Sequence, residues 1–75
     1  MMKLLISSDT VSNATPSTMF LPKEPTVMDA RLIREGSGVV FGQDGETHVK
    51  MHVFDVGDAV VYLTDEQLRL SMGDE

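Results

Sequence analysis

Apolar and polar side chains alternate regularly along residues 47–54. On one parity lie Thr47, Val49, Met51 and Val53, and on the other lie His48, Lys50, His52 and Phe54. A period of two is typical of a half-buried β-strand. Turn residues follow at 55–58, and the run at 59–63 is apolar at every position and rich in β-branched residues. Such a run favours a strand buried on both faces, so the pattern predicts two neighbouring strands.

The segment after this run is interpreted as an acidic turn followed by a third strand. Residues 64–67 interrupt the apolar run, and the alternation then resumes at Leu68, Leu70 and Met72. Thr64 is a suitable N-cap residue, and it favours a short helical turn at the interruption. The last residues, 73–75, are expected to form a frayed tail.

The first third of the chain predicts one strand and a long loop. Residues 3–7 are mostly apolar and favour a strand, whereas residues 8–18 are rich in Ser, Thr, Asn, Asp and Pro and favour a loop. A loop of this length is unusual in so small a domain. The apolar segment Met19-Phe20-Leu21 has two interpretations. We favour a short edge strand or a plug over the core, and the alternative is an exposed anchor for a partner.

The middle of the chain predicts two hairpins. Residues 27–34 alternate as a strand would, although a helix remains the alternative because Thr26 and Asp29 resemble a capping box. Gly36-Ser37-Gly38 predicts a tight turn into a strand at 39–42. Asp44-Gly45 then favours a type I′ turn that pairs this strand with residues 47–54, because glycine accepts positive φ at no steric cost.

Together these elements predict a mainly β fold, with a small α+β fold as the alternative. The expected architecture is an antiparallel sheet or partly open barrel of about five short strands and at most one short helix. The 75 residues are 41% hydrophobic, which indicates one folded domain over residues 1–75. A domain of this size buries only about 60% of its unfolded surface, so its stability is expected to be marginal.

Composition also limits the setting of the protein. The chain contains no cysteine, so disulfides and thiol chemistry are excluded. Residues 4–6 are a much shorter apolar run than the roughly 7–15 residues of a signal-peptide core, and they are interpreted as part of the first strand. No apolar run approaches the ~20 residues of a membrane span. We therefore expect a cytoplasmic protein.

The candidates for chemistry have simple structural interpretations. His48 and His52 lie on one face of a predicted strand with Cα atoms about 13 Å apart, which is too far to share one metal. Two exposed strand histidines are therefore expected. Asp55 and Asp58 lack the spacing of a calcium loop and fit a capped turn. No nucleophile, base or phosphate loop is recognisable, so no enzyme activity, cofactor or metal is expected.

Charge is the feature that points towards a function. The net charge is −6, and it falls entirely after Gln43, where eight carboxylates face Lys50 and Arg69. Such a surface repels nucleic acid and membranes and attracts basic proteins. It is either an ordinary solvated surface or an imitation of a phosphate backbone that occupies a basic nucleic-acid groove. The candidate partner-binding residues are Asp44, Glu46, Asp55, Asp58, Asp65 and Glu66.

A short, acidic, cysteine-free chain of this kind resembles the small phage-encoded anti-CRISPR proteins. The segment from Val60 to Met72 is similar to the strand, acidic turn and strand that end some of them. The resemblance leans towards inhibitors of type I systems, and among these towards type I-C. It implies a CRISPR effector subunit as partner, a host-cell cytoplasm as setting, and a block of target-DNA or PAM recognition or of nuclease recruitment.

A rival hypothesis is a small structural or regulatory phage module. Such a protein would oligomerise through Met19-Phe20-Leu21, or it would act as an antitoxin-like partner of a basic toxin. Steep salt dependence of partner binding favours charge mimicry. Concentration-dependent assembly without any partner favours the structural module. Whether the protein is a monomer or a dimer stays open.

Overall fold

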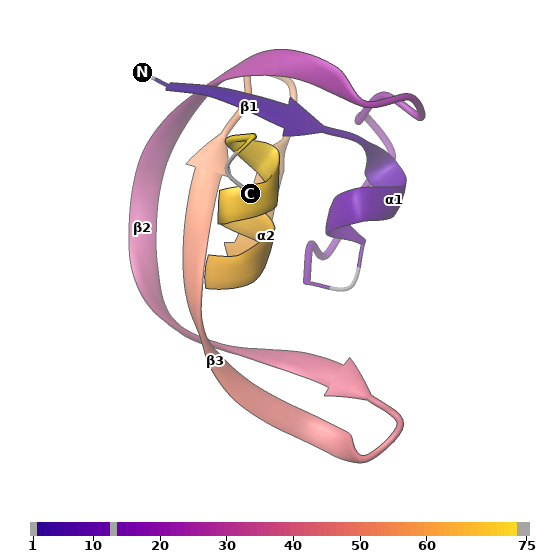
Figure 1. The fold of residues 1–75 in the computed structure, drawn as a ribbon, viewed down its shortest axis with the longest axis vertical. Helices are drawn as coiled ribbons and strands as arrows, with labels where there is room; N and C mark the ends of the chain where they lie inside the picture. The colour runs from indigo at the N-terminus through magenta and orange to yellow at the C-terminus, as the bar shows by residue number, and fades with distance from the viewer. Residues whose placement is uncertain (1, 13, 74–75) are drawn as a thin grey trace.

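A computed structural model describes residues 2–12 and 14–73 of the chain. Within these ranges the chain forms four strands and two helices, shown in Figure 1. Their order is β1 (Met2–Ile6), α1 (Ser8–Val11), β2 (Thr26–Gly42), β3 (Gly45–Asp55), β4 (Val60–Thr64) and α2 (Asp65–Ser71). The strands form one antiparallel sheet in the order β1-β2-β3-β4, which confirms the predicted fold class.

β2 is one long strand that pairs with two different neighbours. It pairs with β1 through residues 26–30 and with β3 from Arg31 to Gly42, and a bulge between Leu32 and Arg34 shifts the register. The strand predicted at 27–34 is confirmed, and the helical alternative is wrong. Figure 1 shows the strand arching over the top of the view beside β1 and then curving down the left-hand side to the far hairpin.

The turn predicted at Gly36-Ser37-Gly38 is wrong, because these residues lie inside β2. Their ladder partners are Met51, Lys50 and Val49 of β3. A Cβ atom added to Gly38 would clash with Cγ of Met51, whereas one added to Gly36 would contact nothing within 4 Å. Gly38 therefore allows the two strands to pack closely. In the sequence, a glycine with this role looks the same as a glycine that forms a turn.

The hairpin between β2 and β3 is confirmed, but its turn differs from the predicted type. Gly42 pairs with Gly45, which leaves Gln43 and Asp44 at the tip. Gly45 has φ of 100°, and no residue other than glycine in the described chain has positive φ. A type I′ turn needs positive φ at both central residues and is therefore excluded. Glycine after the turn is typical of hairpins with a glycine bulge.

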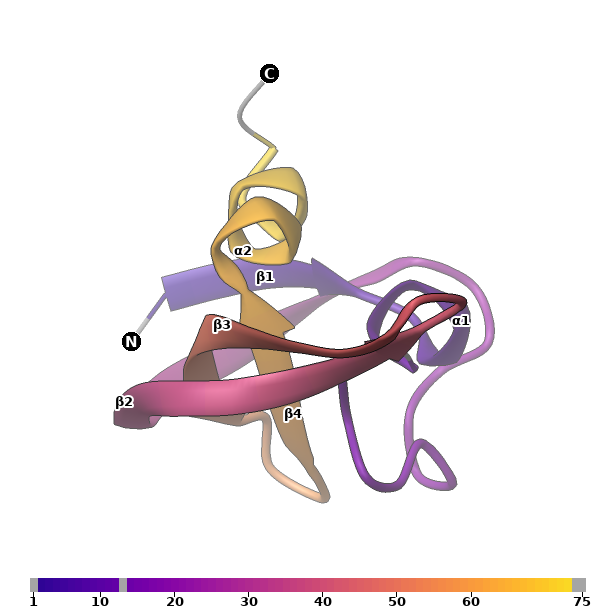
Figure 2. The same ribbon diagram turned by 90° about the horizontal axis from the view of Figure 1, so that it is seen from below.

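The core lies between the sheet and the two helices. The largest fully buried side chains are Phe54, Leu4, Ile6, Leu63, Val11, Val61 and Ser7. α2 contacts β1, β3 and β4, and Figure 2 shows it stacked over β1 on one side of β3. Burial in β4 alternates, since Val61 and Leu63 are buried and Val60 is exposed. The prediction that residues 59–63 are buried on both faces is wrong.

The third strand predicted at residues 68–72 is also wrong, because these residues belong mainly to α2. Thr64 caps the helix by accepting a hydrogen bond of 3.1 Å from the Gln67 amide. Leu68 packs against the core and Ser71 is buried, whereas Leu70 is exposed. The spacing of the inward positions is helical. The predicted cap was correct, but the helix continues beyond one turn. Of the tail predicted to be frayed, residues 74–75 lie outside the described residues.

The predicted loop at residues 8–18 begins later than expected, because residues 8–11 form α1. Ser7 and Thr10 form a capping box at its start, and Val11 is buried. Further on, the Thr15 hydroxyl accepts a 3.1 Å hydrogen bond from the Tyr62 amide and donates one of 3.4 Å to its carbonyl. This one side chain satisfies backbone groups at the outer edge of β4.

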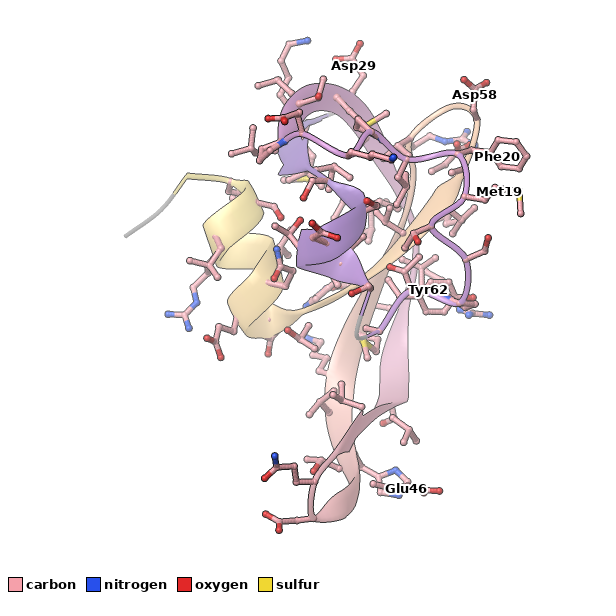
Figure 3. All side chains as sticks on the ribbon, turned by 90° about the vertical axis from the view of Figure 1, so that its right-hand side faces the viewer. Met19, Phe20, Asp29, Glu46, Asp58 and Tyr62 are labelled. Carbon is pink, nitrogen blue, oxygen red and sulfur yellow. The ribbon has the colours of Figure 1, made fainter. Side chains whose placement is uncertain are left out.

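The apolar segment at residues 19–21 divides between the two interpretations. Leu21 is buried and joins the core, as a plug would. Met19 and Phe20 lie in a turn closed by a 3.1 Å hydrogen bond from the Leu21 amide to Thr18, and they are 79% and 70% exposed. Figure 3 shows both side chains pointing away from the ribbon. The edge strand is therefore wrong, and the plug holds for Leu21 alone.

Candidate functional site

The distal half of the β2–β3 hairpin forms a two-stranded arm, which we define as residues 36–51. β1 pairs with β2 only as far as Ala30, and β4 pairs with β3 only from Met51 onwards. Between these limits, the two arm strands pair with each other and with no further strand in the described chain. Figure 1 shows the arm projecting at the lower end of the molecule.

Two of the predicted carboxylates lie at the tip of the arm. Asp44 belongs to the turn and Glu46 to the start of β3, and both are exposed. No ion pair within the described ranges involves either residue. Figure 3 shows Glu46 at the opposite end of the molecule from Asp58. These two carboxylates are therefore available to a partner.

Asp55 and Asp58 lie at the other end, in the connection between β3 and β4. Asp55 accepts a 2.8 Å hydrogen bond from the Gly57 amide and a 3.3 Å bond from the Arg31 guanidinium. These contacts confirm that Asp55 caps the turn, and they partly neutralise its charge. Asp58 is exposed, and it takes part in no ion pair of the described residues.

Asp65 and Glu66 start α2, where Asp65 contacts a buried histidine. His52 is only 6% exposed, and its ring lies between Glu35 and Asp65. Nδ1 of His52 is 2.7 Å from Glu35, and Nε2 bonds to Asp65. One carboxylate thus contacts each nitrogen of the buried ring, and the two contacts connect β3 to β2 and to α2. The bond from His52 lowers the pKa of the Asp65 carboxyl below its ordinary value.

The prediction of two exposed strand histidines is therefore half wrong. His48 is exposed on the arm, as predicted, but His52 lies where β4 and α2 cover β3. The sequence places both histidines on the same face of the strand. It does not reveal that β4 and α2 cover β3 at His52 and not at His48. Among the described residues, no group of three His, Cys, Asp or Glu side chains could hold a metal ion.

A hollow of about 520 Å³ lies between the arm and the start of α2, and we call it the β3-edge hollow. Val40, Thr47 and Val49 line it from the arm. Lys50 lines it from β3, Thr64 from the end of β4, and Asp65 and Glu66 from α2. The structure thus brings the α2 carboxylates to the same hollow as the arm. The six predicted residues form three separated pairs and do not make one continuous cluster.

A second hollow, which the sequence reasoning missed, lies on the outer face of the sheet and is called the outer groove. It measures about 490 Å³ and is lined by Pro16, Ile33, Arg34, Val53, Val60 and Tyr62. The Arg34 guanidinium lies 6.0 Å from the centre of the Tyr62 ring, within range of a cation–π contact. The available signal was the run at 59–63, because one parity fills the core and the other lines this groove.

Comparisons with protein-family models, with curated proteins and with solved structures find no match to this chain. In the described part of the chain, no helix is long and apolar enough to cross a membrane. Two surfaces of the chain itself therefore indicate its function. These are the acidic arm with the β3-edge hollow, and the outer groove with the exposed Met19 and Phe20.

Proposed function

We propose that this protein is a non-enzymatic inhibitor whose acidic surface occupies a basic nucleic-acid-binding surface of a partner protein. The observation that carries the proposal is the set of exposed carboxylates after Gln43 that form no ion pair with a basic side chain of the described chain. They are Asp44, Glu46, Asp58 and Glu66. A groove lined with Lys and Arg binds nucleic acid through its phosphates, and ordered carboxylates offer the same charge.

This contact set is narrower than the one derived from the sequence. Asp55 already bonds Arg31, and Asp65 already bonds His52, so each has less charge to offer a partner. The other four carboxylates are spread over a molecule about 32 Å long. Spread charges accelerate encounter and favour a partner of matching shape, whereas each exposed pair contributes only about 0–1 kcal/mol. Inhibition should therefore depend on the carboxylates collectively.

The first partner to test follows from the resemblance to anti-CRISPR proteins. It is the subunit of a type I CRISPR effector that recognises the PAM or the target DNA, with type I-C as the favoured subtype and a host-cell cytoplasm as the setting. Binding there would keep DNA from the effector. This mechanism needs no cofactor. It also needs no direct contact with nucleic acid, whose phosphates a net charge of −6 repels.

The test is displacement of labelled duplex DNA from the isolated effector. Wild-type protein should displace the DNA, and added salt should weaken this steeply because ionic contacts are screened. The triple variant Asp44→Lys, Asp58→Lys and Glu66→Lys should lose displacement while circular dichroism stays unchanged. The control is Asp9→Lys with Glu24→Lys, which changes net charge on the other half of the chain. This control should retain most of the displacement.

Equal displacement by wild type and the triple variant would contradict charge mimicry. A second candidate function would then be favoured by the exposure of Met19 and Phe20, which lie on the same loop as the groove-lining Pro16. In that case the protein would be a structural or regulatory module that assembles through apolar contact. Sedimentation would show concentration-dependent assembly that Phe20→Ser abolishes.

A further inference from the structure

β4 pairs with only about half of the length of β3, and the rest of that edge of β3 is open. β4 ends at Thr64, opposite Met51, whereas β3 runs back to Gly45. α2 begins at the next residue, Asp65, and leaves the plane of the sheet, as Figure 2 shows. Residues 45–50 thus have β2 on one side and, in the described chain, no strand on the other.

This open edge offers backbone hydrogen bonds to an added strand. In an antiparallel ladder, alternate residues direct their N–H and C=O groups away from the neighbour they already pair with. A row of such groups is the template used when an extended peptide joins a sheet. At 3.4 Å per residue, residues 45–50 present an edge of about 20 Å. That length suits a segment of about five residues.

The side chains around this open edge favour a particular kind of peptide segment as the added strand. The β3-edge hollow lies along it, with Val40 and Val49 contributing apolar surface and Asp65 and Glu66 contributing negative charge. Glu46 adds a further carboxylate on the edge strand itself. An extended segment that alternates β-branched with basic residues would match both features. Lys50 also lines the hollow and opposes such a segment.

We propose that residues 45–50 of β3 bind an extended basic segment of the partner by strand addition. The added strand would lie along the edge of β3 that β4 does not cover. This inference rests on the proposed function and specifies which part of the partner the acidic arm holds. A second copy of the chain fits less well, because two chains of net charge −6 repel each other. The open edge of β2 also fits less well, because Arg31 and Arg34 lie at its base.

The test uses a fluorescein-labelled pentapeptide, Arg-Val-Lys-Val-Arg, and the full-length protein, with binding followed by fluorescence anisotropy. Two further peptides carry N-methyl groups on alternate amides, one at the odd positions and one at the even positions. A strand that pairs along one edge needs only one of these sets. Strand addition therefore predicts that one methylated peptide loses binding by about tenfold or more while the other retains it.

Equal binding of the three peptides would overturn strand addition, since charge alone does not distinguish them. Absence of binding of the unmodified peptide would overturn it as well. Variants of the protein locate the edge. Glu66→Gln should weaken binding and Lys50→Gln should strengthen it, each by about two- to fivefold. Asp58→Asn makes the same type of change at the distant end and should leave binding unaltered.

The outcome is separable from that of the proposed function. If duplex DNA is displaced by the wild type and not by the triple variant, but the peptide fails to bind, charge mimicry stands and strand addition is wrong. If the peptide binds with the predicted methylation pattern but no DNA is displaced, the edge is a peptide site and the inhibitory function is wrong.

Discussion

The molecule contains two regions that are held together in different ways. The body comprises β1, α1, β4, α2 and the parts of β2 and β3 that pair with them, and it contains the buried core. The arm, residues 36–51, is largely exposed on both faces, and Met51 at its base is buried. The body is therefore stabilised by apolar burial, whereas the arm depends mainly on its own ladder.

This difference separates folding from function. A two-stranded ribbon is marginally stable by itself, so the arm is expected to open more readily than the body. Asp44 and Glu46, which the proposed function uses for binding, lie on this less stable arm. Their side chains are not required for packing there. Binding a partner strand would give the arm the third strand that it lacks. The body, in turn, fixes the base of the arm through β4 and α2.

The largest expected effect comes from removing a core side chain of the body. Phe54 is 1% exposed, so Phe54→Ala should lower the free energy of unfolding by about 3–5 kcal/mol. That is comparable with the whole stability of a chain of this size. The matched arm variant, Val49→Ala, should cost about 1 kcal/mol or less. Urea unfolding followed by circular dichroism measures both, and equal losses would show that arm and body share one core.

The next effect tests the joint between the regions. Gly38→Ala places a Cβ atom against Met51, a buried side chain that must shift, and should cost about 1–3 kcal/mol. Gly36→Ala is the matched control, because it meets open space two residues away. The control should be neutral or slightly stabilising. The same unfolding assay measures both variants. An unchanged free energy of unfolding for Gly38→Ala would mean that the close approach of the strands does not contribute to stability.

The smallest effect concerns the contact that ties α2 to the base of the arm. His52 lowers the pKa of the Asp65 carboxyl, so this contact stabilises the fold above the ordinary aspartate pKa of about 4. The stabilisation is lost as pH falls through the lower, folded-state value. Asp65→Asn should therefore reduce the melting temperature at pH 6 and have less effect at pH 2. Glu66→Gln, a neighbouring control without this contact, should show a smaller dependence on pH.

An unchanged melting temperature of Asp65→Asn at pH 6 would mean that the contact with His52 does not stabilise the fold. The pH 2 measurement provides an internal reference, because a larger fraction of the wild-type carboxyl is protonated there than at pH 6. A difference in melting temperature that shrinks between pH 6 and pH 2 reflects the ionised contact, whereas one that stays constant reflects packing of the side chain.

The sequence predicted the strands well where one pattern dominated. The alternation at residues 47–54 and the Asp44-Gly45 signal gave the β2–β3 hairpin, because each follows from local backbone chemistry. The turn at Gly36-Ser37-Gly38 failed because a glycine that admits Met51 is indistinguishable, in sequence, from one that makes a turn. Only the packed structure shows which residue needs the space.

The arrangement of the six candidate carboxylates could not be predicted from the sequence. All six carboxylates were identified from charge, but their separation into three pairs depends on β3 spanning the molecule, a long-range property. The burial of His52 depends on α2, which was interpreted as a strand because Leu68, Leu70 and Met72 alternate. Thr64 gave the correct signal for the start of the helix, whereas the alternation of three residues was too short to decide its length.

The most direct measurement of the central claim compares two variants in the DNA-displacement assay. One reverses charge on the arm and at α2, Asp44→Lys with Glu66→Lys, and the other removes the exposed apolar pair, Met19→Ser with Phe20→Ser. Charge-based binding predicts that the first variant loses most of its displacement and that the second retains it. Retention by the first and loss by the second would contradict that claim and would place the partner on the apolar loop.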